Sequence, residues 1–215
     1  MRVPSWGDRL LAAADNALRT LVSPLPVGSG RPSPAAGYSA EPSLTAAEQS
    51  LARSLMRVNH AGEVAAQALY QGQALAAGAD HGLASLLQSA AREEADHLRW
   101  CEDRIRDLGG RTSLLNPLWY AGAFGLGFVA GRLGGPISLG FLSETERQVE
   151  AHLESHLARL PQNDGASRAV VTQMIRDEAE HGQSARSHGA RTLPFPIRQA
   201  MQLSGRVMTG TAHYL

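Results

Sequence analysis

The chain has no lysine, a single cysteine and few aromatic residues, which make up 5% of its 215 residues. The lone Cys101 excludes an intramolecular disulfide framework and gives no reason to expect an oxidising compartment. All 20 basic residues are arginines, balanced by 20 acidic residues, and this neutrality argues against non-specific nucleic-acid binding. We therefore expect a cytosol-facing protein with no nucleic-acid partner.

Strand signals are also nearly absent, because no alternating Val, Ile or Thr runs bounded by turn residues occur. The residues that dominate, Ala, Leu, Arg, Glu and Gln, are good helix formers. Apolar residues recur with a helical period in four long segments, at 45–77, 82–108, 138–160 and 166–189. The sequence thus predicts an all-α protein with a ferritin-like four-helix bundle, of a length that suits one domain.

The residues before the predicted bundle divide into two parts. The pattern of residues 1–22 predicts an amphipathic helix. Asp15 and Asn16 interrupt its apolar residues, so it would make a poor signal-peptide core. Residues 23–43 are crowded with Pro, Gly and Ser and have no apolar period, so they predict a linker. The remaining residues, 44–215, form the predicted bundle domain.

An apolar, glycine-rich segment, 114–142, separates the second and third predicted bundle helices. It approaches transmembrane length, but Arg132 and the break at 134–136 divide it into pieces too short to span about 30 Å of hydrocarbon. One interpretation is a crossover inserted in a membrane interface, and the other is a buried crossover with glycine-mediated helix packing. Large apolar patches usually contact something, which favours the interface. The aromatic residues that would rest there are Trp119, Tyr120, Phe124 and Phe128.

Two Glu-x-x-His pairs, Glu94/His97 and Glu178/His181, are the most informative motif of the chain. Residues three apart on a helix share a face, so each pair can offer a carboxylate and an imidazole to one centre. Both glutamates lie on the apolar stripe of their predicted helix. In ferritin-like bundles such pairs come from two helices, and each of the other two helices adds one glutamate.

The other two predicted helices each carry one acid on their apolar stripe. These are Glu63 in 45–77 and Glu146 in 138–160. Tyr70, further along the stripe of Glu63, either borders the site or is an ordinary core residue. Four carboxylates in an apolar interior would each cost several kcal/mol if left unpaired, so the pattern predicts two divalent cations. Mixed carboxylate and imidazole ligation favours iron, with manganese as a substitute.

The neighbouring acids fall off these stripes and are predicted to be solvated. They are Glu93, Asp96, Asp177 and Glu180. The remaining histidines are predicted to lie at the surface or just outside the ligand set, with His152 and His188 as candidates to orient a ligand or touch substrate. These histidines are His60, His81, His152, His156, His188 and His213.

Four strings in the sequence resemble those of the demethoxyubiquinone hydroxylase family, the di-iron monooxygenases of ubiquinone biosynthesis. The strings are Asn-His-Ala-Gly-Glu at 59–63, Glu-Glu-Ala-Asp-His at 93–97, Glu-Thr-Glu-Arg-Gln at 144–148 and Asp-Glu-Ala-Glu-His at 177–181. The resemblance extends over most of the chain. It implies that two iron ions bind to one ligand set, in which Glu94 and Glu178 bridge the metals. The ligand set is Glu63, Glu94, His97, Glu146, Glu178 and His181.

The same resemblance implies an activity and a location. The expected reaction is hydroxylation, with O2, of the ring of a demethoxy polyprenyl benzoquinol. The bacterial members resemble the chain best, so we expect peripheral attachment to the cytoplasmic face of the inner membrane, through 114–142. This segment is also expected to wall the passage of the substrate to the metals. A homo-oligomer and a lipid-presenting helper protein both stay open as partners.

Two rival functions compete with this hypothesis. One is another ferritin-like di-iron protein, for iron storage or peroxide scavenging, which would have the same ligands but no use for an interfacial segment. The other is a metal-free helical adaptor that docks at membranes through 114–142 and 195–209. The adaptor predicts no bound metal, and a storage protein predicts assembly into a cage.

Overall fold

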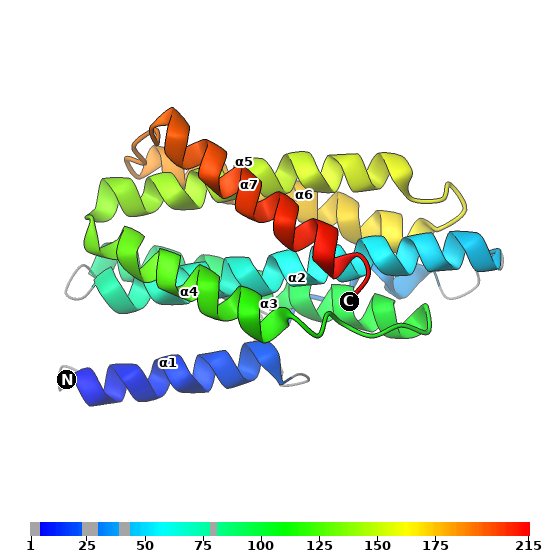
Figure 1. Ribbon diagram of the computed structural model, residues 1–215, viewed down its shortest axis with the longest axis horizontal. Coiled ribbons are helices and arrows are strands. Elements are labelled where there is room, and N and C mark those ends of the chain that lie inside the picture. Colours follow the sequence, from blue (N-terminus) through cyan, green and yellow to red (C-terminus); the bar gives the residue numbers. More distant parts are fainter. Residues whose placement is uncertain (1–4, 23–29, 39–43, 78–80) are drawn as a thin grey trace.

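The computed structural model describes residues 5–22, 30–38, 44–77 and 81–215, and these ranges contain helices but no strands. The elements are α1 (Trp6–Leu21), η1 (Pro34–Gly37), α2 (Ala46–Ala77), α3 (His81–Asp107), α4 (Asn116–Arg132), α5 (Gly135–Arg159), α6 (Gly165–Ser187) and α7 (Phe195–Ala212). Helices α2, α3, α5 and α6 form a four-helix bundle, and α1, α4 and α7 lie against its outside (Figure 1). The predicted all-α, ferritin-like fold is therefore confirmed.

The ends of the bundle helices follow from local sequence. At the start of α2 the Thr45 hydroxyl accepts from the Glu48 backbone N–H, and the Glu48 carboxylate accepts from the Thr45 N–H, at 2.8 Å. The predicted break after α4 is confirmed, because Gly134 has a φ of 102° and Pro136 occupies the first turn of α5. Asp164 caps α6 by accepting from the Ser167 N–H at 2.9 Å. Each predicted bundle helix is thus correct to within about three residues at either end.

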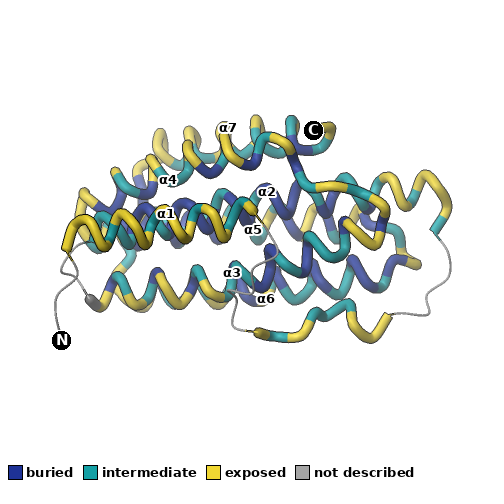
Figure 2. The backbone as a smooth tube through the Cα atoms, turned by 90° about the horizontal axis from the view of Figure 1, so that it is seen from below, coloured by how far each residue is buried: buried dark blue, intermediate teal, exposed yellow. Residues whose placement is uncertain are grey.

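Two apolar clusters fill the bundle interior, one towards each end. One cluster includes Met56, Trp100 and Leu153, and the other includes Leu87 and Leu142. Figure 2 shows the buried stripe that runs along each of the four helices. Because the clusters lie on either side of the positions of the predicted ligands, those ligands occupy a dry central layer.

Helix α4 packs tightly along α2 through glycines. A Cβ added at Gly127 would overlap the backbone carbonyl oxygen of Leu69, and one added at Gly131 would lie 2.7 Å from that of Gln73. The glycines therefore allow the two backbones to approach closely, as the buried-crossover interpretation requires. Leucine and valine side chains on the other faces of α4 stay exposed. In the part of the chain that the structure describes, no helix is long and apolar enough to cross a membrane.

The segment predicted as a linker is described in part. Residues 30–38 pack against α3 and α6, and η1 lies within them. Residues 23–29 and 39–43 lie outside the described residues. Helix α1 packs against α2 and α4, with no fully buried residue of its own.

The glycine packing of α4 predicts opposite effects for two substitutions on one helix. Gly127→Ala places a methyl group against the Leu69 carbonyl, so we expect the free energy of unfolding to fall by about 1–3 kcal/mol. The methyl group of Gly125→Ala would point into open space. This substitution should raise the free energy of unfolding by about 0.5–1 kcal/mol, because alanine favours the helix more than glycine does. Urea unfolding followed by circular dichroism measures both, and equal effects would contradict the close packing of α4 on α2.

Candidate metal centre

The structure brings the six predicted ligands together at the centre of the bundle, one or two from each helix. Their side chains form two groups whose ligand atoms lie within 4.8 Å of one another. The first group is Glu63, Glu94, His97 and Glu178, and the second is Glu94, Glu146, Glu178 and His181. Glu94 and Glu178 belong to both groups. The arrangement can therefore hold two metal ions that share two carboxylates.

His97 points one ring nitrogen at the carboxylates and the other away from them. Its Nδ1 lies 3.0 Å from Glu94 Oε2, 3.4 Å from Glu178 Oε1 and 3.6 Å from Glu63 Oε2. Its Nε2 lies 2.8 Å from Asp177 Oδ2. With a proton on Nε2, facing the Asp177 carboxylate, the lone pair of Nδ1 would be left for a metal.

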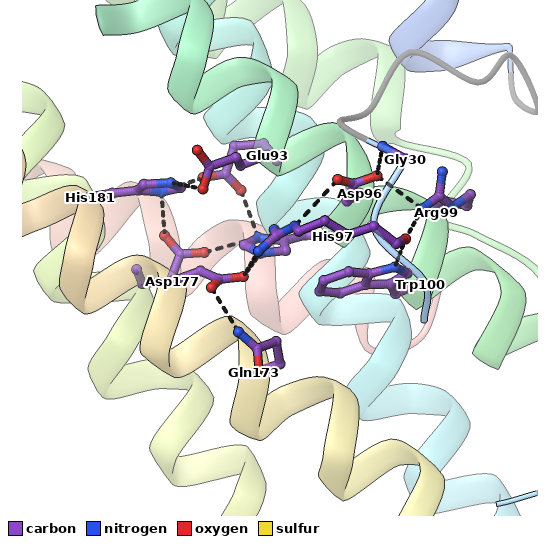
Figure 3. A network of polar contacts seen from close by, with 12 residues as sticks. Gly30, Glu93, Asp96, His97, Arg99, Trp100, Gln173, Asp177 and His181 are labelled. Carbon is purple, nitrogen blue, oxygen red and sulfur yellow. Dashed lines mark hydrogen bonds and ion pairs between the residues drawn. The ribbon is translucent and has the colours of Figure 1, made fainter. Parts of the chain in front are cut away.

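His181 repeats this arrangement at the other position. Its Nδ1 lies 3.2 Å from Glu94 Oε1, 3.8 Å from Glu146 Oε1 and 3.9 Å from Glu178 Oε2. Its Nε2 lies 3.1 Å from Glu93 Oε2. Each imidazole is thus held by a carboxylate outside the ligand set, and both of these contacts are drawn in Figure 3.

The prediction that the acids beside the stripes are solvated is wrong for Asp96 and Asp177 and holds only in part for Glu93. Glu93 is partly buried against His181, whereas Asp96 and Asp177 are buried. Only Glu180 is exposed, as predicted. The apolar stripe identifies the face of one helix that points towards the core. These three side chains instead reach sideways, to a ligand on the neighbouring helix or to residues 30–38. A position one residue away from a ligand does not distinguish them, because Glu180 also neighbours a ligand, His181, and is exposed.

The polar atoms of this layer test whether a metal fits. Five carboxylate oxygens and one imidazole nitrogen of the six residues are buried without a hydrogen-bond partner in the structure. They are Glu63 Oε2, Glu94 Oε1, Glu146 Oε2, both Glu178 oxygens and His181 Nδ1. Four of the oxygens lie within 4.0 Å of an imidazole nitrogen, but none of the six atoms has a hydrogen bond, which is costly for buried polar atoms. Two cations would satisfy them, and the set of oxygen and imidazole donors fits iron.

The pKa shifts of the buried glutamates also indicate that the layer needs positive charge. Burial and the nearby Glu94 raise the pKa of Glu63, and burial and Glu178 raise that of Glu146, so the neutral acids are favoured. Burial also opposes ionisation of Glu94, but the rings of His97 and His181 outweigh it and hold the pKa of Glu94 well below its usual value. Without metal, protons must therefore supply the missing positive charge.

Tyr70 borders the site, which agrees with one of the two interpretations of this residue drawn from the sequence. Its hydroxyl donates to Glu146 Oε1. Burial, and then the charge of Glu146, raise its pKa well above the ordinary value, so it stays a protonated donor.

Two of the remaining histidines are core residues, which corrects the prediction of a surface or near-ligand position. His60 lies by Asn116, and His156 Nδ1 lies 2.6 Å from Asn59 Oδ1. Burial lowers the pKa of His60 to about 4 and that of His156 to about 3, so both are neutral at pH 7. Of the two candidates to orient a ligand or touch substrate, His152 packs at a tilt against the ring of His156, and His188 Nδ1 lies 2.7 Å from the Ser184 carbonyl oxygen. The side chain of His81 lies outside the described part.

A cavity of about 480 Å³ lies between α1, α2 and α3. Its walls include Ala13 and Thr20 from α1, Gln67 and Tyr70 from α2, and Ala91 from α3. Tyr70 therefore touches both the cavity and the ligand layer. Residues 114–142, which are expected to wall the passage of the substrate, do not line this cavity, but Phe128 and Arg132 of that segment line a second pocket beside α1.

Comparison with known proteins identifies relatives over nearly the whole chain. The family described as "Ubiquinone biosynthesis protein COQ7" matches residues 50–212. A "3-demethoxyubiquinol 3-hydroxylase" of Verminephrobacter eiseniae is 58% identical over 211 residues, covering 98% of this chain and 100% of the relative. A protein of the same description from Polaromonas sp. is 56% identical over 208 residues, covering 97% and 98%.

The family match and the relatives agree with the resemblance that the four sequence strings indicated. The matched residues contain all six side chains of the central layer. Because the match covers nearly all of the bundle, from residue 50 onwards, this chain belongs to the family of ubiquinone biosynthesis protein COQ7.

Proposed function

We propose that the chain is a di-iron monooxygenase that hydroxylates the ring of a demethoxy polyprenyl benzoquinol with O2 in ubiquinone biosynthesis. The observation that carries this proposal is the pair of overlapping ligand groups, joined by Glu94 and Glu178, in a dry bundle. The names of the relatives, 3-demethoxyubiquinol 3-hydroxylase, support the substrate and the reaction. Iron storage or peroxide scavenging would use similar ligands, but the relatives do not carry such names.

The proposed site divides its ligands between two positions. Glu63 and His97 would hold one ion, and Glu146 and His181 would hold the other. The two shared glutamates, Glu94 and Glu178, would bind both ions. Four glutamates would neutralise two iron(II) ions, which makes the buried layer close to neutral. Bound iron would supply the activation of O2 and the redox equivalents for the hydroxylation.

The chain's own residues would orient the ligands and exclude water. Asp177 and Glu93 fix the two imidazoles so that each Nδ1 faces the carboxylates. The apolar clusters on either side of the layer keep bulk water from the reacting ring. Tyr70 holds a proton at its hydroxyl oxygen, beside Glu146 and at the edge of the cavity.

We place the substrate in the cavity between α1, α2 and α3. Its volume of about 480 Å³ suits a quinol ring with the first part of its tail. Its apolar inner wall includes Leu87 and Leu98, and Tyr70 lies where the cavity meets the ligand layer. Helix α1 forms the outer wall, and it can move without disrupting the core because none of its residues is fully buried.

The proposed location is the cytoplasmic face of the inner membrane, with peripheral attachment. A polyprenyl tail dissolves in a bilayer, and the chain exposes apolar residues on α4, including Leu118, which is 60% exposed, and Leu126. The aromatic residues expected to insert are less suited to this role. Tyr120 is buried, and Phe124 packs against the core. The leucines of α4 are therefore the better candidates for contact with lipid.

The division of ligands predicts different metal counts for single substitutions. Glu94→Ala removes a ligand from both positions, so we expect the protein to retain neither ion. Glu63→Ala should lose one ion and keep the other, because Glu63 belongs to one group only. Elemental analysis after anaerobic loading with iron(II) measures the count, and Glu180→Ala, at an exposed position, serves as the control. Two ions retained in Glu94→Ala would contradict shared ligation.

The proposed activity predicts turnover by the purified, iron-loaded protein. With a chemical reductant and ¹⁸O2, a short-tailed demethoxyubiquinol should gain one labelled oxygen on its ring, as detected by mass spectrometry. Ala13→Trp fills the cavity from α1, so it should raise KM about tenfold while the iron content stays unchanged. Ala14→Trp, on an exposed face of the same helix, is the control. Absence of labelled product would refute the activity, and an unchanged KM would refute the cavity as the substrate site.

The proposed attachment predicts weaker binding to anionic liposomes when Leu118 and Leu126 are both replaced by serine. The loss of two exposed leucines should lower the partition coefficient on the order of tenfold or more. Cosedimentation measures the bound fraction. Tyr38→Ser, an exposed residue next to η1 on the other side of the bundle, should leave it unchanged. Equal binding by the double variant and the parent would exclude α4 as the contact surface.

A further inference from the structure

Residues 30–38 cross the bundle surface over α3 and α6, beside the ligand layer. Arg31 makes the central contacts of this crossing. Its Nη1 lies 2.9 Å from Asp177 Oδ2, its Nε lies 3.4 Å from Asp96 Oδ2, and its guanidinium stacks 4.9 Å from the ring centre of Trp100. Arg31 therefore joins α3 and α6 through three side chains, two carboxylates and an indole.

The backbone around Arg31 is fixed as well. Its carbonyl oxygen accepts from Arg99 Nη2 at 2.6 Å and from Trp100 Nε1 at 3.4 Å. The neighbouring Gly30 N–H donates to Asp96 Oδ1 at 3.3 Å, and Figure 3 shows these residues gathered beside His97. Arg31 is held at both its backbone and its side chain. Its guanidinium has therefore lost most of its conformational freedom and can orient the groups that it contacts.

One oxygen of Asp177 connects Arg31 to the ligand layer. Asp177 Oδ2 accepts from Arg31 Nη1 at 2.9 Å and lies 2.8 Å from His97 Nε2. Arg31 Nη2 also lies near His97 Nε2, but at 3.4 Å it is the more distant partner. The second oxygen, Oδ1, accepts from Gln173 at 2.9 Å. The position of the Asp177 carboxylate, and with it the orientation of the His97 ring, therefore depends on Arg31.

The other imidazole has a weaker support, because the charge of Arg31 also acts on Glu93 but no hydrogen bond joins the two side chains. Glu93, which contacts His181, has a side chain that is 38% exposed. Among the residues that the structure describes, no arginine forms an ion pair with Glu93 within 4.0 Å. The two halves of the site are therefore unequal, with a charged and stacked support behind His97 and a partly solvated carboxylate behind His181.

We infer that Arg31 is a positioning residue that acts through Asp177 to hold the His97 half of the site ready for metal, so that this half binds its ion more tightly than the His181 half. The inference rests on the proposed two-metal function. It assigns a role to a segment whose composition suggested only a linker. Partners outside the ligand set typically change metal affinity by about 10- to 100-fold, so the expected effect is measurable.

The test uses cobalt(II) as the probe, titrated anaerobically into the full-length chain with a competing chelator. Each half of the site is isolated in its own background. Glu146→Ala should leave the His97 half, and Glu63→Ala should leave the His181 half. Adding Arg31→Gln should weaken cobalt binding at least tenfold in the Glu146→Ala background and less than threefold in the Glu63→Ala background.

Three controls separate positioning from general damage. Arg31→Lys keeps the charge but can reach fewer partners, so it should recover part of the affinity. Arg106→Gln removes an exposed arginine that pairs with Glu102 and Asp103, and it should change neither affinity. Circular dichroism of the metal-free variants checks that the helices are retained. A general loss of structure would instead weaken both backgrounds alike.

The outcomes distinguish this inference from the proposed function. If the parent chain binds no cobalt in the bundle, the two-metal function itself fails. If the parent binds two ions but Arg31→Gln has no effect, or affects both backgrounds equally, the role of Arg31 is overturned and the proposed function stands. A selective loss in the Glu146→Ala background, partly recovered by lysine, supports the inference.

Discussion

Four glutamates, Glu63, Glu94, Glu146 and Glu178, are buried in one layer of the bundle. Carboxylates so close together repel one another and lose their hydration, so the layer requires positive charge. Protons on His97, His181 and some of the acids can supply it, but they leave several buried oxygens without a partner. Two metal ions would satisfy charge and coordination together, and the remaining features of the fold serve that layer.

The surroundings of the layer divide into rigid and adjustable parts. The apolar clusters on both sides and the glycine packing of α4 on α2 fix the backbone positions from which the ligands project. Asp177 and Glu93 then fix the imidazoles. Helix α1, by contrast, covers the cavity with few buried contacts. A tightly packed centre is thus combined with a loosely packed helix over the cavity in which we propose that the substrate binds.

The sequence predicted the bundle and the ligand layer well because both depend on periodicity within single helices. Glu63 and Glu146 were found this way, each as the inward acid of its stripe. Contacts between helices, or between a helix and an irregular segment, have no such signal. Asp177 and Arg31 are 146 residues apart in the sequence, and their ion pair depends on the path of the chain over α6. The cavity behind α1 could not be predicted for the same reason, since it depends on how α1 is placed against α2 and α3.

Diffraction from crystals of the iron-loaded protein at the iron absorption edge would locate the metal ions. We expect two anomalous peaks inside the bundle, one beside Nδ1 of His97 and one beside Nδ1 of His181, with the carboxylates of Glu94 and Glu178 between them. A single peak, or peaks outside this layer, would contradict this expectation.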